Sequence, residues 1–391
     1  MGAAGLDADY LRELGDLVLR FLHVVAGIAW IGASFYFIRL DLGLAPPSER
    51  SDIDEGVAGE YWGVHGGGFY HSKKYQVAPR VLPEPLHWFK WEAYTTWLSG
   101  FALLVLLYWS DADTRLIDPG VAELTAWEAI AASAGLLLGG WLVYDAACRL
   151  LRNDAAVAIT TALLVAGVAW VSGELFAARA AYLQVGAVLG TIMAANVLAV
   201  IIPAHRELVR AKEEGREPDP APGLRAKQRS VHNNYLTLPV VFAMLAGHFP
   251  LTFGSDRAWL VLLAIFAILV VVRHFFNLMH RGRMPLLLLG AAAAGAVALA
   301  FALAPDDEPV AILFEGVSDG QAELVVIDRC RSCHVGSSAP LGVSLETIDE
   351  MRLRAEDIAR QVQSRAMPPG NVTGITDHER DLLIAWAGGA R

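Results

Sequence analysis

Apolar residues follow one another in long stretches through most of this chain, separated by shorter polar segments. Eight stretches are long enough for a helix to cross about 30 Å of hydrocarbon, and all of them lie within residues 1–304. They are Leu17–Ile38, Trp91–Trp109, Ala126–Cys148, Ala155–Ala177, Ala181–Ala204, Val231–His248, Ala258–Phe276 and Pro285–Ala304. The pattern predicts an all-α fold that begins with an eight-span transmembrane helical bundle over residues 1–304.

The pattern changes after residue 304. The polar run at residues 305–309 opens a predicted linker over residues 305–318, and residues 319–391 are no longer membrane-like. Thr376 followed three residues later by Glu379 predicts a capped helix start. Leu382, Leu383 and Trp386 then give this last helix an apolar face. We therefore expect a small α-helical domain over residues 319–391.

Composition and charge support this division. Hydrophobic residues make up 55% of the chain, which is typical of a membrane domain. The net charge of −10 argues against nucleic acid as a partner. Lys and Arg are concentrated in the loops after the first, third, fifth and seventh stretches, and such loops face the cytoplasm. We expect a multi-pass protein of the bacterial inner membrane, in contact with lipids, with both termini on the periplasmic side.

The small domain carries a redox motif. Cys330 and Cys333 are followed at once by His334, and Cys-x-x-Cys-His is the attachment signal of a c-type haem. Both thiols would form thioethers, and His334 would bind the iron. Met367 precedes two prolines, and a methionine sulfur is a usual second axial ligand. A zinc or redox dithiol is the alternative reading. The sequence predicts one covalent haem c in a cytochrome c domain outside the membrane.

Histidines inside or beside the spans are candidates for a second cofactor. His23 lies within the first stretch, near Gly27 and Gly32, and could bind a haem b or form a hydrogen bond with a neighbouring helix. An electron that crosses about 30 Å of bilayer needs an intermediate site, unless the substrate binds deep or outside. The other candidate haem b ligands are His87, His205, His232, His248 and His274.

The polar segment 41–90 is too long for a simple connector. It interleaves aromatic rings, glycines, histidines and lysines, a mixture that suits a planar anionic ligand. Anchoring to lipid headgroups is the alternative. The triple glycine 66–68 lacks the strand, turn and helix context of a dinucleotide site.

Two parts of the chain carry a family resemblance. Residues 62–70 with the lysines that follow, and residues 86–92, resemble the N-terminal membrane domain of the bacterial membrane-bound urate oxidases. Residues 366–373, with 376–380 and Trp386, are similar to the cytochrome c fused to that domain, so the resemblance covers essentially the whole chain. It implies oxidation of urate to 5-hydroxyisourate, with electrons passed to a periplasmic cytochrome c or a terminal oxidase rather than directly to oxygen.

Site residues are assigned on this basis as candidates. Urate or a related purine would be bound by rings, cations and amides: Trp62, Lys73, Lys74, Trp88, Lys90, Asn233 and Asn234. Oxidation with addition of water needs a general base, and the candidates are His65, His87, Glu92 and His232. Two other functions remain open, a quinol–cytochrome c oxidoreductase and a membrane-anchored electron carrier that serves another dehydrogenase. A homo-oligomer is also left open by the sequence.

Overall fold

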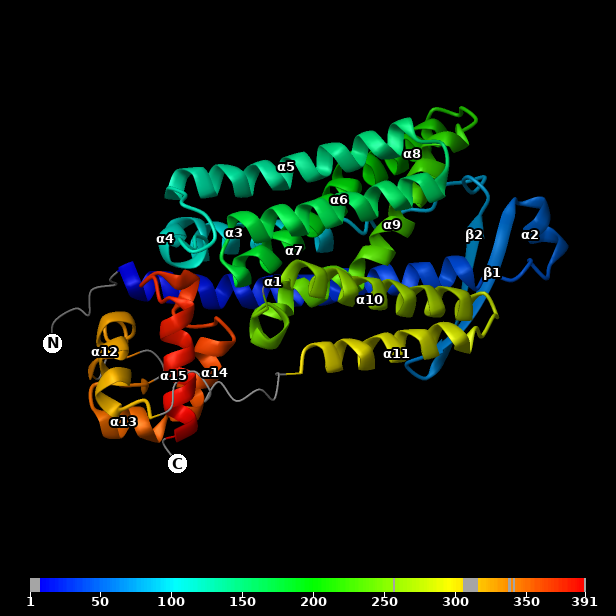
Figure 1. Ribbon diagram of the computed structural model, residues 1–391. Helices are drawn as coiled ribbons and strands as arrows, with labels where there is room; N and C mark the ends of the chain where they lie inside the picture. Colours follow the sequence, from blue (N-terminus) through cyan, green and yellow to red (C-terminus); the bar gives the residue numbers. More distant parts are fainter. Residues whose placement is uncertain (1–7, 256, 305–315, 337–338, 340–341, 390–391) are drawn as a thin grey trace. The chain divides into compact units, whose positions relative to one another are not determined.

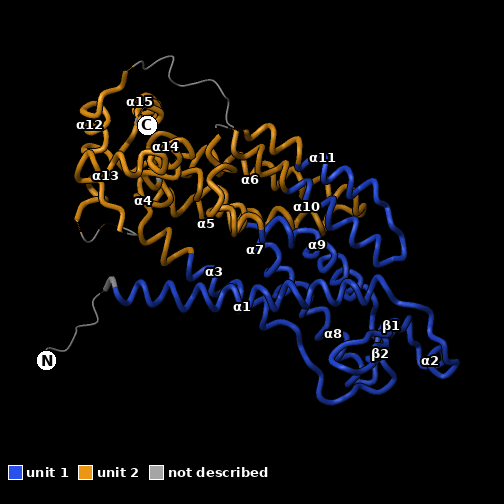
Figure 2. Tube along the Cα trace, turned by 90° about the horizontal axis from the view of Figure 1, so that it is seen from below, with its two compact units in different colours: residues 1–103, 187–241, 266–296 blue, residues 104–186, 242–265, 297–391 orange. Residues whose placement is uncertain are grey.

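The computed structural model describes residues 8–255, 257–304, 316–336, 339 and 342–389. Most of these residues are helical (Figure 1). Residues 305–315 of the linker predicted over residues 305–318 lie outside the described residues. The chain divides into two compact units (Figure 2). Unit 1 comprises residues 1–103, 187–241 and 266–296, and unit 2 comprises residues 104–186, 242–265 and 297–391.

Eleven α-helices are described before residue 304, in agreement with the predicted helical fold. They are α1 (Ala8–Leu42), α2 (Arg50–Asp54), α3 (Trp91–Leu107), α4 (Ala112–Arg115), α5 (Ala126–Leu150), α6 (Asp154–Leu175), α7 (Ala178–Asn196), α8 (Ile202–Glu213), α9 (Pro220–Leu245), α10 (Ala258–His280) and α11 (Leu286–Ala302). A π-helical turn, η2 (Val197–Ile201), joins α7 to α8 without a break.

Six helices of the described chain are long and apolar enough to cross a membrane. They are Tyr10–Leu42, Trp91–Arg115, Ala126–Leu150, Asp154–Leu175, Ala178–Glu213 and Ala258–His280. The eighth predicted stretch is the shorter apolar helix α11. The sixth begins inside α9 and ends three residues beyond it, at His248. The first half of α9 contains Arg225, Lys227 and Arg229 and is therefore more polar. Six of the eight stretches thus meet the length and composition of a span, and the count of eight remains a prediction.

A β-hairpin is the main departure from an all-α fold. Strands β1 (Val57–His65) and β2 (Gly68–Tyr75) pair antiparallel, with Trp62 opposite His71. Gly66 and Gly67 form the two-residue turn, with φ values of 58° and 82°. Both angles are positive, as a type I′ hairpin turn requires, and glycine adopts them without strain. The long polar segment 41–90 is therefore partly an ordered sheet.

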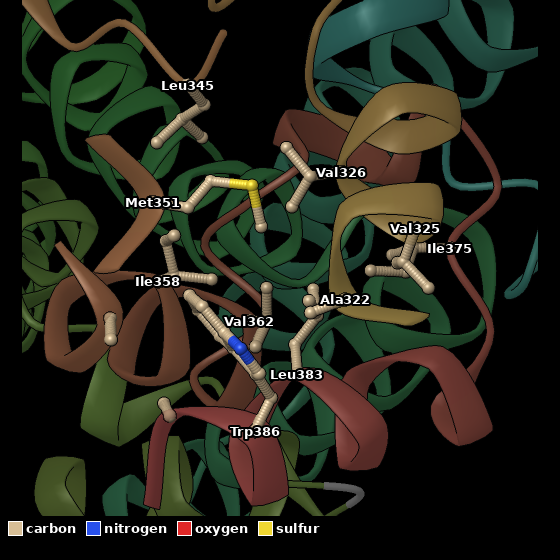
Figure 3. Close-up of a cluster of buried hydrophobic side chains, with 12 residues drawn as sticks. Ala322, Val325, Val326, Leu345, Met351, Ile358, Val362, Ile375, Leu383 and Trp386 are labelled. Atoms are coloured by element: carbon tan, nitrogen blue, oxygen red, sulfur yellow. The ribbon is translucent and has the colours of Figure 1, made fainter. Parts of the chain in front are cut away.

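Four helices form the small domain after residue 316: α12 (Asp319–Arg329), α13 (Ile348–Leu353), α14 (Ala355–Gln363) and α15 (Asp377–Gly389). Their apolar faces meet in a buried cluster around Met351, Leu383 and Trp386 (Figure 3). The predicted capping box is confirmed, because the amide of Glu379 donates to the Thr376 hydroxyl and the amide of Thr376 donates to the Glu379 carboxylate. Within unit 2, the short turn η8 (Pro369–Asn371) contacts α4.

Candidate functional site

The end of α12 presents the Cys-x-x-Cys-His motif. Cys330 caps the helix and is partly buried against the core, whereas Cys333 is exposed. Burial raises the pKa of the Cys330 thiol to about 11. The Nδ1 atom of His334 lies 2.8 Å from the carbonyl oxygen of Val343. A histidine held by Nδ1 has its Nε2 atom free to bind a metal.

Met367 lies on a segment that a buried arginine holds. Arg380, only 5% exposed, donates from Nη1 to the carbonyl oxygens of Val362 and Met367, both at 2.9 Å. Its Nη2 atom donates to the side-chain oxygen of Asn371 at 3.2 Å. Met367 itself stays 37% exposed. Two thiols, an Nδ1-anchored histidine and an exposed thioether are the residue types that a covalent haem requires.

His23 joins α1 to α3 in unit 1. Its Nδ1 atom lies 2.9 Å from the carbonyl oxygen of Thr96 and 3.3 Å from the hydroxyl of Ser99. Gly100 lets the imidazole lie against the α3 backbone, since a Cβ at that position would be 2.7 Å from Cε1 of His23. The hydrogen bond to a neighbouring helix is thus present, and this use of Nδ1 leaves Nε2 for a ligand.

The hairpin lysines are engaged with carboxylates. Lys73 lies 2.7 Å from the buried Asp52, and this hydrogen bond raises the pKa of Lys73. Lys74 pairs with Asp41, which also receives Lys227 at 3.0 Å. Burial, and then the charge of Lys227, lowers the pKa of Lys74. These lysines hold the hairpin to its surroundings.

Sequence reasoning missed a pair formed by His71 and Glu60 next to the Trp62 ring. Trp62 stacks on His71 with 4.0 Å between ring centroids and an interplanar angle of 7°. The Nε2 atom of His71 lies 2.8 Å from the buried carboxylate of Glu60. Hydrogen bonds from Ser48 and His71 lower the pKa of Glu60. The alternation of residues along a hairpin strand would have placed Glu60 and Trp62 on one face.

The remaining loop candidates are spread along the segment. His65 is exposed beside the hairpin turn, and His87 makes an edge contact with Phe89. Lys90 lies 5.6 Å from the centroid of the Trp91 ring. Glu92 lies in the first turn of α3. A surface pocket of about 540 Å³ includes Trp88 in its lining, and the full lining is Arg80, Val81, Leu82, Pro83, Glu84, Leu86, Trp88, Val209, Lys212 and Glu213.

Asn233 and Asn234 are buried and engaged with neighbouring helices. The Asn233 side chain accepts from the Asn196 amide at 2.9 Å and donates to the carbonyl of Met193 at 3.0 Å. The Asn234 oxygen accepts from Nε of Arg273 at 2.6 Å. These contacts place both asparagines inside unit 1, where their side chains bind other residues of the helices.

The other candidate histidines lie on four different elements of the chain. His205 lies on α8, His232 on α9 and His248 in a short 3₁₀ turn, η3 (Ala246–His248). His274, on α10, is within 2.7 Å of the Tyr235 hydroxyl through Nδ1. Over the described residues, no group of three or more His, Cys, Asp or Glu side chains is placed to hold a metal ion.

Two buried arginines are the second feature that sequence reasoning missed. Arg229 and Arg273 are 3% and 4% exposed, although the charge pattern predicts that basic residues next to the span ends lie in loops. Arg273 lies inside the predicted seventh stretch, and an ionisable residue within a span is the signal that could have identified it.

The family model described as "Urate oxidase N-terminal" matches residues 9–304. Comparisons with curated proteins and with solved structures found no match.

Proposed function

Because the chain belongs to the urate oxidase N-terminal family, we propose that it oxidises urate to 5-hydroxyisourate and passes the electrons to a covalent haem c. Family membership supports a urate-related oxidoreductase, and the proposal adds the product and the acceptor. Urate and one water give 5-hydroxyisourate, two protons and two electrons. The electrons leave one at a time because a haem iron accepts a single electron.

The observation that carries the proposal is the division of the chain. The family match ends at residue 304, and the Cys-x-x-Cys-His motif begins at residue 330. Substrate chemistry is thus assigned to the helical bundle and electron acceptance to the small domain. A urate oxidase that used oxygen directly would have no need of the second part.

In the small domain, Cys330 and Cys333 would hold the haem by thioethers, and His334 and Met367 would bind its iron. Bound in this way, the haem supplies a one-electron acceptor whose potential the methionine raises. Arg380 holds the Met367 backbone and so limits the movement of its side chain. The Val343 carbonyl fixes the orientation of His334.

In the bundle, we assign His23 as a ligand of a non-covalent haem b. The support is the Nδ1 contact with Thr96, which orients the imidazole, and the close approach allowed by Gly100. For the base that takes a proton from water or urate, we favour His232. It lies next to the buried Asn233 and Asn234 on α9, whereas His65 lies at the exposed tip of the hairpin.

The same proposal locates the protein in the bacterial inner membrane with the small domain in the periplasm. The Cys-x-x-Cys-His motif and the distribution of Lys and Arg between alternate loops both support this orientation. A soluble cytochrome c or a terminal oxidase would receive the electrons there.

Anaerobic mixing of the purified, haem-loaded full chain with urate tests the proposal. We expect urate to reduce the haem c absorption bands, with 5-hydroxyisourate formed in a ratio of one per two electrons. The double variant Cys330→Ala/Cys333→Ala is the matched control and should yield no covalent haem to reduce. Reduction by a quinol but not by urate would replace the proposal with a quinol–cytochrome c oxidoreductase. Reduction only by an added dehydrogenase would indicate an electron carrier.

A further inference from the structure

Arg273 is a buried cation with an unused donor. Its guanidinium lies over the Phe35 ring, 4.0 Å from the centroid, and its Nε atom donates to Asn234. Its Nη2 atom is buried and makes no hydrogen bond within the described part of the chain. An arginine offers five donors in a planar fork, and leaving a buried donor unused destabilises the fold. The side chain is therefore arranged for a partner that the described residues do not supply.

A second buried arginine belongs to the same unit. Arg229, on α9, donates from Nη1 to the Asn196 oxygen at 3.3 Å, and Asn196 in turn donates to Asn233. Asn196 is the residue that precedes the π-helical turn η2. Such turns occur frequently at functional sites. Asn234 bonds directly to Arg273, whereas its neighbour Asn233 bonds to Asn196, which in turn bonds to Arg229.

The partners of Arg273 differ from those of the loop cations. Lys73 and Lys74 bind the carboxylates of Asp52 and Asp41, whereas the contacts of Arg273 are an amide oxygen and a phenyl ring. A buried charge is costly unless it is paired. An anionic ligand would provide the missing negative charge, and a planar one with carbonyl edges would match the guanidinium fork.

We propose that Arg273, with Arg229, forms the binding site for the urate anion inside the helical bundle. This inference rests on the proposed function and specifies its substrate site. Urate carries one negative charge near neutral pH, and its carbonyl oxygens accept hydrogen bonds from Nη2 of Arg273. Asn233, Asn234 and Asn277 position the arginines, because their amides are engaged within the network. The hairpin lysines then contribute structure rather than substrate charge.

The test compares Arg273→Gln with the unaltered full chain in detergent. Dithionite first reduces the haem, so that urate binds without being oxidised, and equilibrium dialysis gives Kd. Loss of charge-assisted hydrogen bonds should raise Kd by about 10- to 100-fold. The KM for urate-driven haem reduction should rise similarly. Arg273→Lys keeps the positive charge but lacks the planar guanidinium, so its Kd should lie between that of the unaltered chain and that of Arg273→Gln.

Arg281→Gln is the matched control, because Arg281 is an exposed arginine just beyond the end of α10. Its Kd should equal that of the unaltered chain. Covalent haem content and a monodisperse elution peak establish that each variant is folded, and Arg273→Lys replaces Arg273→Gln if the latter misfolds.

The outcomes separate this inference from the proposed function. Unchanged Kd and KM in both Arg273 variants, with urate still reducing the haem, would overturn the arginine site and leave the proposed function standing. Failure of the unaltered chain to bind urate or be reduced by it would overturn both.

Discussion

Replacement of Gly100 by alanine should displace the His23 imidazole. The added Cβ would lie 2.7 Å from Cε1 and 3.1 Å from Nδ1 of His23, whereas carbon atoms pack well at about 3.5–4.0 Å. The ring must therefore move by roughly 1 Å. The 2.9 Å contact between Nδ1 and the Thr96 carbonyl would then exceed normal hydrogen-bond length. Overpacking of this kind destabilises a fold by about 1–3 kcal/mol.

Gly139 on α5 provides the matched comparison, because a Cβ there would meet nothing within 4 Å. Alanine in a helix interior is favoured over glycine by about 0.5–1 kcal/mol, so Gly139→Ala should be neutral or stabilising. Denaturant unfolding of the detergent-solubilised full chain, followed by tryptophan fluorescence, measures the difference. Acid extraction separates covalent from non-covalent haem, and only the non-covalent fraction should fall in Gly100→Ala.

Equal midpoints for Gly100→Ala and Gly139→Ala would refute the packing of His23 on α3. A lower midpoint with unchanged non-covalent haem would keep the packing and reject His23 as a haem b ligand.

Three further predictions concern the small domain and the hairpin. Met351→Ala removes a fully buried side chain and should destabilise the small domain by about 2–5 kcal/mol. The haem c absorbance during denaturation measures this loss, and Leu353→Ala, at an exposed position, should change the stability little. Arg380→Met should weaken Met367 ligation and lower the haem c midpoint potential, so an unchanged potential in a spectroelectrochemical titration would contradict the role of Arg380. The pKa of Glu60 is lowered in the fold by hydrogen bonds from Ser48 and His71, so the stability it provides is complete above the unfolded-state pKa of about 4.3 and is lost as pH falls through the lower folded-state pKa. Amide protection of β1 and β2 should follow that curve, and Glu60→Gln should flatten it.

Local rules predicted the elements whose signals are local. The Thr376 and Glu379 spacing gave the start of α15 correctly, because a capping box depends on residues only three apart. Long apolar stretches likewise gave most of the helices. The hairpin was missed even though Gly66 and Gly67 lie between two runs of alternating residues, which is itself a hairpin signal.

The buried network could not be derived in the same way. A sequence shows that Arg273 follows an apolar run, but the contacts with Asn234 and Phe35 join three separate helices. A count of charges treats every arginine near a span end as a loop residue, whereas the structure shows that Arg273 is buried. The ion pairs of Lys73 and Lys74 could not be predicted for the same reason, because their partners Asp52 and Asp41 are distant in the sequence.

The junction at Asp41 gives the hairpin a mechanical connection to the bundle. Asp41, in the last turn of α1, binds Lys74 of β2 and Lys227 of α9. Nearby, Arg39 contacts the Tyr61 hydroxyl of β1 and Nδ1 of His280 on α10. Helices α9 and α10 carry Arg229 and Arg273, so a shift of either helix on anion binding would be transmitted to the exposed strands. A fluorescent label at the hairpin turn would thus work as an optical sensor of site occupancy, readable while the haem spectrum stays constant.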